Sequence, residues 1–136
     1  MATTDVAQRN IEMARKGYAA FNEGDIQTAM DGFSDDIVWH GGKRGPLAGD
    51  YKGKPAVLGL LMKFGQLTEG SYKAEIHDIL SNGEHGVVIG VSKATRNGKT
   101  LQEKFVDVVH INADGKATEF WRFQEDQVGA LEWLES

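Results

Sequence analysis

The sequence contains no cysteine, so disulfide frameworks, thiolate nucleophiles and cysteine-ligated metals are excluded. It also lacks an excess of basic residues: the 136 residues carry a formal net charge of -5, whereas nucleic-acid affinity rests mainly on clustered Lys and Arg. No apolar stretch is long enough to span a bilayer, and residues 1–10 lack the apolar core of a signal peptide. These absences predict a soluble, cytoplasmic protein without nucleic-acid or membrane partners.

Signatures of bound metals and cofactors are also missing. The four histidines are dispersed and show no metal-ligand spacing: His40, His77, His85 and His110. The Gly-rich segment 41–45 has neither Walker spacing nor the context of a dinucleotide-binding turn, and no Gly-x-Ser-x-Gly motif occurs. We therefore expect no metal and no cofactor.

The first half of the chain has the apolar periodicity of helices. Apolar residues recur every three or four positions over residues 5–21, which predicts an amphipathic helix that stops at Asn22-Glu23-Gly24. Asp25 is a suitable cap for a short second helix. A strand over residues 35–40 then enters a Gly-rich loop, and Pro55 opens a third helix.

The second half has the pattern of an antiparallel meander. Asn82-Gly83, Asn97-Gly98 and Asp114-Gly115 favour two-residue hairpin turns, and each is flanked by alternating apolar and polar residues. Four strands between residues 71 and 124 follow, with a short C-terminal helix from Asp126. The chain is therefore expected to be one α+β domain over residues 1–136, with its helices covering one face of a curved antiparallel sheet.

The turns also predict which side chains share a face of this sheet. If each turn has two residues, Asp107 lies opposite Arg122, Val88 lies beside Asp107, and His77 lies beside Val88. The predicted transverse row is His77, Val88, Asp107 and Arg122. A bulge in any strand would change this register.

Apolar residues separate onto the two faces. Those expected to line a cavity are Tyr18, Phe21, Trp39, Phe64, Phe105, Val109 and Phe120. The opposite face carries Val106, Val108, Trp121 and Phe123, and no helix remains to cover it, so we expect it to pair with a second copy in a homodimer. In the inverted alternative, Trp121 enters the pocket and Phe120 leaves it.

Four segments resemble the nuclear transport factor 2-like superfamily, specifically its SnoaL-like and ketosteroid-isomerase-like branch. These are residues 20–25, 33–40, 47–53 and 112–116, each a signature of a helix end, a strand or a turn. The resemblance implies a cone-shaped fold with a deep apolar pocket, usually in a homodimer. Such folds serve isomerases, cyclases, dehydratases, epoxide hydrolases and non-enzymatic binders, so the fold does not name the reaction.

One functional residue of the ketosteroid isomerases has a counterpart in this sequence, and two others do not. Asp107 matches the aspartic acid that lines the isomerase pocket and donates a hydrogen bond to the developing oxyanion. Ketosteroid isomerase is itself a standard example of an enzyme that raises the pKa of a carboxylic acid in an apolar site. The positions of the oxyanion-hole tyrosine and of the catalytic base correspond to Gly17 and Gly41. Steroid isomerisation by that mechanism is therefore not expected, and Arg122 would favour an ionised Asp107.

The residues support a hypothesis of cofactor-independent proton transfer on a small apolar molecule. Asp107 would be the general base, Arg122 would orient it and stabilise an anion, and His40 or His77 would be the second proton-transfer group. The simpler alternative is that Asp107 and Arg122 form a structural ion pair. A non-catalytic ligand carrier and an assembly module are the other two functions compatible with this sequence.

Overall fold

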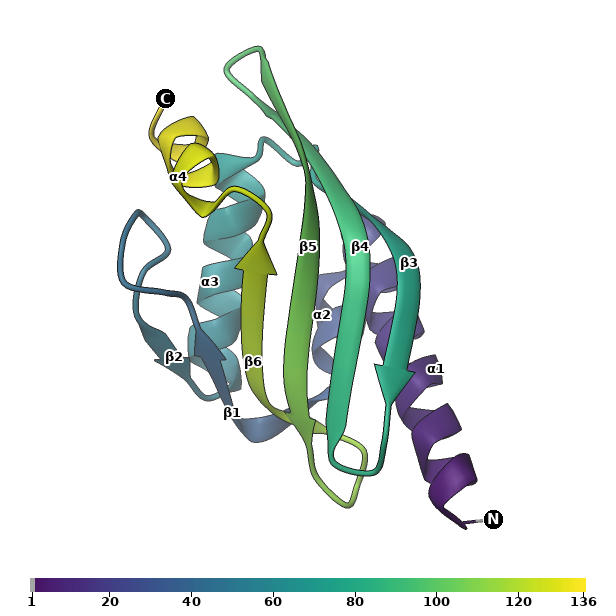
Figure 1. The fold of residues 1–136 in the computed structure, drawn as a ribbon. Coiled ribbons are helices and arrows are strands. Elements are labelled where there is room, and N and C mark those ends of the chain that lie inside the picture. Colours follow the sequence, from purple (N-terminus) through teal and green to yellow (C-terminus); the bar gives the residue numbers. More distant parts are fainter. Residues whose placement is uncertain (1) are drawn as a thin grey trace.

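A computed structural model describes residues 2–136, with side chains from Asp5 onward. Its helices and strands, in chain order, are α1 (Ala2–Asn22), α2 (Ile26–Met30), β1 (Phe33–His40), β2 (Asp50–Lys52), α3 (Lys54–Leu67), β3 (Lys73–Ser81), β4 (His85–Arg96), β5 (Lys99–Ile111), β6 (Ala117–Gln124) and α4 (Gln127–Glu135) (Figure 1). The predicted helices and strands are all present, and β2 is an additional strand inside the expected Gly-rich loop.

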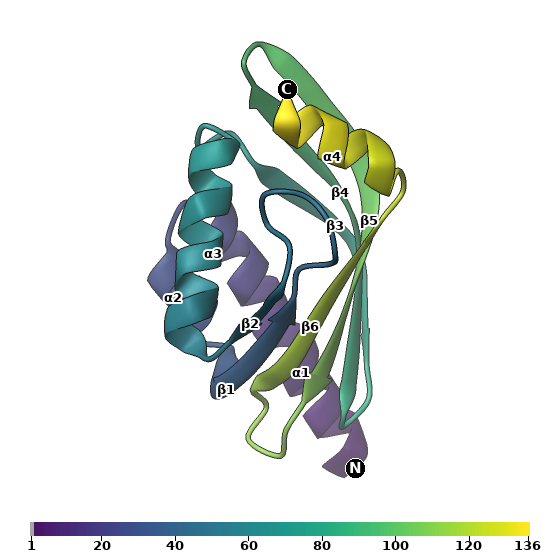
Figure 2. The same cartoon turned by 90° about the vertical axis from the view of Figure 1, so that its left-hand side faces the viewer.

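The strands form one six-stranded sheet in the order β2-β1-β6-β5-β4-β3. Neighbouring strands are antiparallel except β1 and β6, which are parallel. The sheet is strongly curved, and α1, α2 and α3 lie on its concave side (Figure 2). The predicted α+β architecture is confirmed, with one parallel pair where a wholly antiparallel sheet was expected.

The helices cover the concave face because their apolar sides match its apolar strands. Ile11, Ala14 and Tyr18 of α1 pack against a buried cluster from β3, β4 and β5. Val57 and Leu61 of α3 join a second cluster with Ile37 of β1. Asp25 and Asp126 cap α2 and α4 through their carboxylates, as N-cap residues do. The wide end of the cone remains open between these clusters.

The predicted pairing of β4, β5 and β6 is confirmed at the residues that matter for the site. Asp107 pairs with Arg122 and with Val88. The Asn97-Gly98 turn has two residues as expected, with Arg96 paired to Lys99. At the next hairpin Ile111 pairs with Ala117, which leaves five residues, 112–116, between the strands, and a register shift between His110 and Ile111 restores the predicted pairing from His110 onward. The change of register at the hairpin and the shift between His110 and Ile111 therefore cancel, and Asp107 still lies opposite Arg122.

The predicted position of His77 is wrong. The first hairpin closes between Ser81 and Gly86, two residues later on β4 than a two-residue turn would give, so Ile79 is the partner of Val88. A further irregularity between Ile76 and Asp78 leaves His77 outside the paired register. His77 is exposed there, and it does not belong to the row of Val88, Asp107 and Arg122.

Candidate functional site

A cavity of about 450 Å³ lies between the concave face of the sheet and the helices. The loop 41–49 and α4 border its wide end through Leu47, Ala130 and Leu131. The loop is held by backbone hydrogen bonds between Gly41, Gly42 and Gly49. A Cβ on Gly41 would clash with the Leu47 carbonyl oxygen, so this position cannot carry the carboxylate that an isomerase would have there.

A bidentate ion pair lies at the floor of this cavity. Arg122 donates from Nε to Asp107 Oδ1 at 2.7 Å and from Nη2 to Asp107 Oδ2 at 2.8 Å. Asp107 is completely buried and is not among the residues that line the cavity, whereas the Arg122 side chain is 23% exposed and does line it. The carboxylate therefore lies behind the guanidinium that it neutralises.

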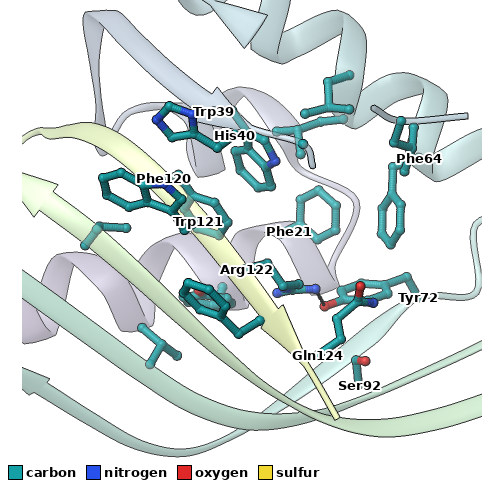
Figure 3. Close-up of a pocket in the computed structure, with 18 of the residues that line it drawn as sticks. Phe21, Trp39, His40, Phe64, Tyr72, Ser92, Phe120, Trp121, Arg122 and Gln124 are labelled. Atoms are coloured by element: carbon teal, nitrogen blue, oxygen red, sulfur yellow. Dashed lines mark hydrogen bonds between the residues drawn. The ribbon is translucent and has the colours of Figure 1, made fainter. Parts of the chain in front are cut away.

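Two tyrosines complete this network. The Tyr18 hydroxyl donates to Asp107 Oδ2, and Arg122 Nη1 donates to the Tyr72 hydroxyl at 2.6 Å (Figure 3). Burial, followed by the Asp107 charge, holds the pKa of Tyr18 well above its usual value, and burial also raises the pKa of Tyr72. Both phenols therefore stay neutral and can act as hydrogen-bond donors.

Arg122 stays a cation in this apolar setting. Burial alone would lower the pKa of Arg122, but the Asp107 charge raises it well above the usual value. The guanidinium also lies 4.1 Å from the centroid of the Phe105 ring, a favourable cation-π geometry. Of its five N–H groups, three are used by Asp107 and Tyr72, which leaves two for a ligand oxygen.

Because Asp107 is buried behind Arg122, its role is to hold neighbouring side chains in place. Its two oxygens accept three hydrogen bonds from Arg122 and Tyr18, and no part of it is accessible from the cavity. This geometry does not support the general-base role that the sequence suggested for Asp107. The structure instead places the Arg122 guanidinium and the Tyr72 hydroxyl at the cavity surface.

Aromatic rings form much of the cavity wall. Trp39 and Phe120 stack with ring centroids 3.7 Å apart, and Phe21, Phe64 and Tyr72 contact one another edge to face or tilted (Figure 3). Of the residues predicted to line the cavity, Tyr18, Phe21, Trp39, Phe64, Val109 and Phe120 do so. Phe105 does not, because it lies beneath the guanidinium and is 2% exposed. The inverted face assignment is wrong for Phe120, which is buried within this wall, whereas Trp121 also borders the cavity, as that alternative had it.

His40 borders the cavity but makes its polar contacts elsewhere. Its Nε2 lies 2.9 Å from Glu119 Oε2, and its Nδ1 lies 2.9 Å from Asp50 Oδ1. The His40 ring stacks on Trp121. The Trp121 side chain projects from one face of β6, whereas the side chains of its chain neighbours Phe120 and Arg122 project from the other face. His40 therefore does not join Asp107 in one constellation. Glu119 also contacts His110 Nδ1 at 3.0 Å, and the two residues are paired across β5 and β6.

The His40–Glu119 pair predicts a pH-dependent contribution to stability. The hydrogen bond to Glu119 is the main cause that raises the pKa of His40, and the same contact lowers the pKa of Glu119. A raised histidine pKa stabilises the fold below the unfolded value of 6.5, and this contribution disappears as the pH rises through the folded value. His40→Asn should therefore reduce the urea midpoint more at pH 5.5 than at pH 8.5.

The matched control for this experiment is His77→Asn, because His77 is an exposed histidine outside the pair. Its effect on the urea midpoint should be small and similar at both pH values. Equal losses for His40→Asn at the two pH values would show that the pair is not ionic in the folded protein.

Several polar residues of the cavity were not anticipated from the sequence, and four of them lie near the ion pair or contact one another. They are Tyr72, Ser92, Glu103 and Gln124. Ser92 lies opposite Glu103 in the β4–β5 pairing, and Gln124 Nε2 donates to Glu103 Oε1 at 2.7 Å. The alternation of residues along β5 did indicate Glu103, because it places Glu103 on the same face of the strand as Asp107. Tyr72 lies just before β3, where no periodic pattern would reveal it.

Comparison with known proteins agrees with this fold and geometry. Residues 14–120 match the model of the SnoaL-like domain family. An uncharacterised protein of Mycobacterium tuberculosis is 29% identical over 119 residues, covering 86% of this chain and 89% of that protein. The family match covers most of the chain and confirms the SnoaL-like part of the resemblance inferred from sequence, and solved NTF2-like proteins share the fold.

Two solved structures have both high similarity and nearly complete coverage. Bal32a, from a soil-derived mobile gene cassette, has a TM-score of 0.87 and 30% identity, covering 95% of this chain and 98% of its own. TerC, co-crystallised with polyporic acid, has a TM-score of 0.82 and 27% identity, covering 94% of this chain and 99% of its own.

Within the residues that the structure describes, no helix is long and apolar enough to cross a membrane.

Proposed function

We propose that this protein, which belongs to the SnoaL-like domain family, binds a small aromatic carbonyl compound in its cavity and promotes cofactor-independent proton transfer on it. The observation that carries the proposal is the Arg122 guanidinium, which is neutralised from behind by a fully buried Asp107 and borders a cavity with a largely aromatic wall. Similarity to TerC, which was crystallised with polyporic acid, supports a ligand of this kind.

The aromatic wall would select a flat apolar body. Trp39 stacked on Phe120 forms one side, and Phe21, Phe64 and Tyr72 form another. Stacked and edge-to-face contacts favour an aromatic ligand over an aliphatic one of the same size. Specificity in such cavities comes from a few well-placed polar groups, and here these would be Arg122 and Tyr72.

The polar end would hold a carbonyl oxygen and stabilise the negative charge that develops on it. Two N–H groups of Arg122 and the hydroxyl of Tyr72 would donate to this oxygen. Preorganised donors in a water-poor site stabilise an enolate more strongly than the neutral ketone, which is the condition for catalysis. Asp107 and Tyr18 would act as positioning residues that fix the guanidinium.

Tyr72→Phe tests this arrangement with the enolisable ketone 2-tetralone as probe. The wild-type protein should bind 2-tetralone in isothermal titration calorimetry. Loss of one hydrogen bond from the phenol should weaken binding by about 5- to 10-fold, or roughly 1 kcal/mol. Tyr51→Phe is the matched control, because Tyr51 is outside the cavity lining and its hydroxyl bonds to Ala48.

Two results would count against the proposed function. Absence of any binding by the wild-type protein, to 2-tetralone and to polyporic acid alike, would contradict a cavity built for aromatic carbonyl compounds. Equal affinities for wild type and Tyr72→Phe would remove Tyr72 from the oxygen-binding end.

We further propose that the convex face of the sheet forms a homodimer. Leu80, Val87, Val108 and Trp121 are paired in a row across β3, β4, β5 and β6. Ile89, Val106 and Phe123 form a second row beside it. Leu80 is 50% and Phe123 is 58% exposed, so this is a contiguous apolar surface of the kind that protein contacts cover. A self-complementary sheet face suits two-fold association.

A further inference from the structure

Glu103 is a buried carboxyl group in the cavity whose role the bidentate ion pair does not explain. It is 5% exposed, it lies on β5, and it lines the cavity on the same strand face as Asp107. Its Oε1 accepts a hydrogen bond from Gln124 Nε2 at 2.7 Å. Its Oε2 is buried and has no hydrogen-bond partner among the described residues.

A buried carboxyl oxygen without a partner is uncommon in folded proteins, and each such group calls for a functional or structural reason. Gln124 fixes one oxygen and so orients the carboxyl group, while Oε2 is left without a hydrogen-bond partner, and Glu103, unlike Asp107, is among the residues that line the cavity. Burial raises the pKa of Glu103, against the opposing influences of the Gln124 amide, the nearby Asp126 backbone N–H, which does not reach hydrogen-bond geometry, and the Arg122 charge. A carboxylate with a raised pKa is a stronger base than an ordinary glutamate.

We propose that Glu103 is the proton-transfer residue of this cavity and that it works together with Arg122 across one bound carbonyl compound. This inference rests on the proposed function and adds the base that Asp107 does not provide. Gln124 connects the two groups: it bonds to Glu103, and it lies two residues after Arg122 on the same face of β6. Two residues of a strand span about 7 Å.

That span suits an enolisable carbonyl group. The ketone oxygen would lie on Arg122 and Tyr72, and the adjacent carbon would lie about 3 Å from the Glu103 carboxyl group, as proton transfer requires. Glu103 would take the proton from that carbon. The electron pair of the C–H bond would become the C=C bond of the enolate, and the carbonyl π electrons would move to the oxygen held by Arg122. Return of a proton to carbon restores the ketone and the carboxylate.

Deuterium exchange tests this step without knowledge of the natural substrate. With 2-tetralone in D₂O, the wild-type protein should accelerate deuterium incorporation at the carbon next to the carbonyl, followed by NMR. Glu103→Gln should lower this exchange rate by about 100-fold, because general-base catalysis contributes at least that factor in typical enzymes. Its affinity for 2-tetralone should stay within a few-fold of wild type, since the amide oxygen can still accept from Gln124.

Two further variants make the readout specific. Glu75→Gln is the matched control, because Glu75 is exposed on β3 and is outside the cavity lining, and it should exchange deuterium like wild type. Glu103→Asp retains a carboxylate and should recover part of the lost rate, which a structural role for the Glu103 side chain would not predict.

The outcomes separate this inference from the proposed function. Binding of 2-tetralone with equal exchange rates in wild type and Glu103→Gln would overturn the role of Glu103 and leave the binding function intact. Failure of the wild-type protein to bind 2-tetralone and polyporic acid alike would overturn the proposed function, and the role of Glu103 with it. Binding with a rate loss confined to Glu103→Gln, and partly restored in Glu103→Asp, is the expected result.

Discussion

Replacement of Asp107 by Ala should destabilise the protein by about 3 kcal/mol or more, because it removes one member of a buried ion pair. Asp107 is completely buried and accepts both bonds of the Arg122 fork, as well as the Tyr18 hydroxyl. Without the carboxylate, the guanidinium remains in an apolar site with the Phe105 ring as its main compensation. Urea unfolding at neutral pH measures the loss.

The double variant Asp107→Ala, Arg122→Met distinguishes a lost ion pair from a simple cavity. If the penalty arises from an uncompensated charge, removal of Arg122 as well should recover at least about 1 kcal/mol relative to the sum of the two single variants. Additive losses, or a loss below about 1 kcal/mol for Asp107→Ala alone, would contradict the buried pair described above.

Replacement of Phe123 by Glu should dissociate the proposed homodimer. Phe123 is 58% exposed on β6 and pairs with Val106 within the apolar convex face. A charge at the centre of an apolar interface is desolvated on association, so the dissociation constant should rise by about 30-fold or more, or at least 2 kcal/mol. Light scattering over a concentration series measures this change.

Met62→Glu is the control for that variant. Met62 is 51% exposed, but it lies on α3, on the side of the sheet away from the proposed interface. The wild type and Met62→Glu should be dimers at micromolar concentration, whereas Phe123→Glu should be a monomer. A monomeric wild type at that concentration would contradict the interface.

The sequence predicted the central pairing because turn chemistry and strand alternation act locally. Asn97-Gly98 forms the expected two-residue turn, which places Val88 beside Asp107. Asp107 and Arg122 were also paired correctly, although five residues lie between their strands, where the sequence predicted a two-residue turn. A bulge offsets the resulting change of register, and no local signal in the sequence indicates it.

The errors arose where tertiary packing decides the outcome. His77 was misplaced because the first hairpin is two residues longer than Asn82-Gly83 suggested: the backbone of Asn82 bonds to that of His85. His40 has the expected strand position, but Glu119 and Asp50 hold its ring on the other side of the sheet from Arg122. Asp107 was assigned a chemical role that depends on accessibility, which a sequence pattern does not specify.

The residues missed by the sequence analysis share a physical reason. Glu103 lies on the predicted face of β5, yet the unpartnered oxygen of its carboxyl group becomes visible only when Gln124 and the start of α4 are placed around it. Tyr72 reaches the site from the segment before β3, 50 residues away in sequence from Arg122. Long-range contacts of this kind leave no periodic signal in the chain.

The most direct test of the site is the ¹³C NMR shift of the carbonyl carbon of labelled 2-tetralone bound to the protein. If Arg122 and Tyr72 hold and polarise the ketone oxygen, the bound signal should move downfield of its position in water, and Tyr72→Phe should reverse part of that shift. A bound signal upfield of the aqueous one, as in an apolar solvent, would show that the carbonyl does not meet the guanidinium and would contradict this account.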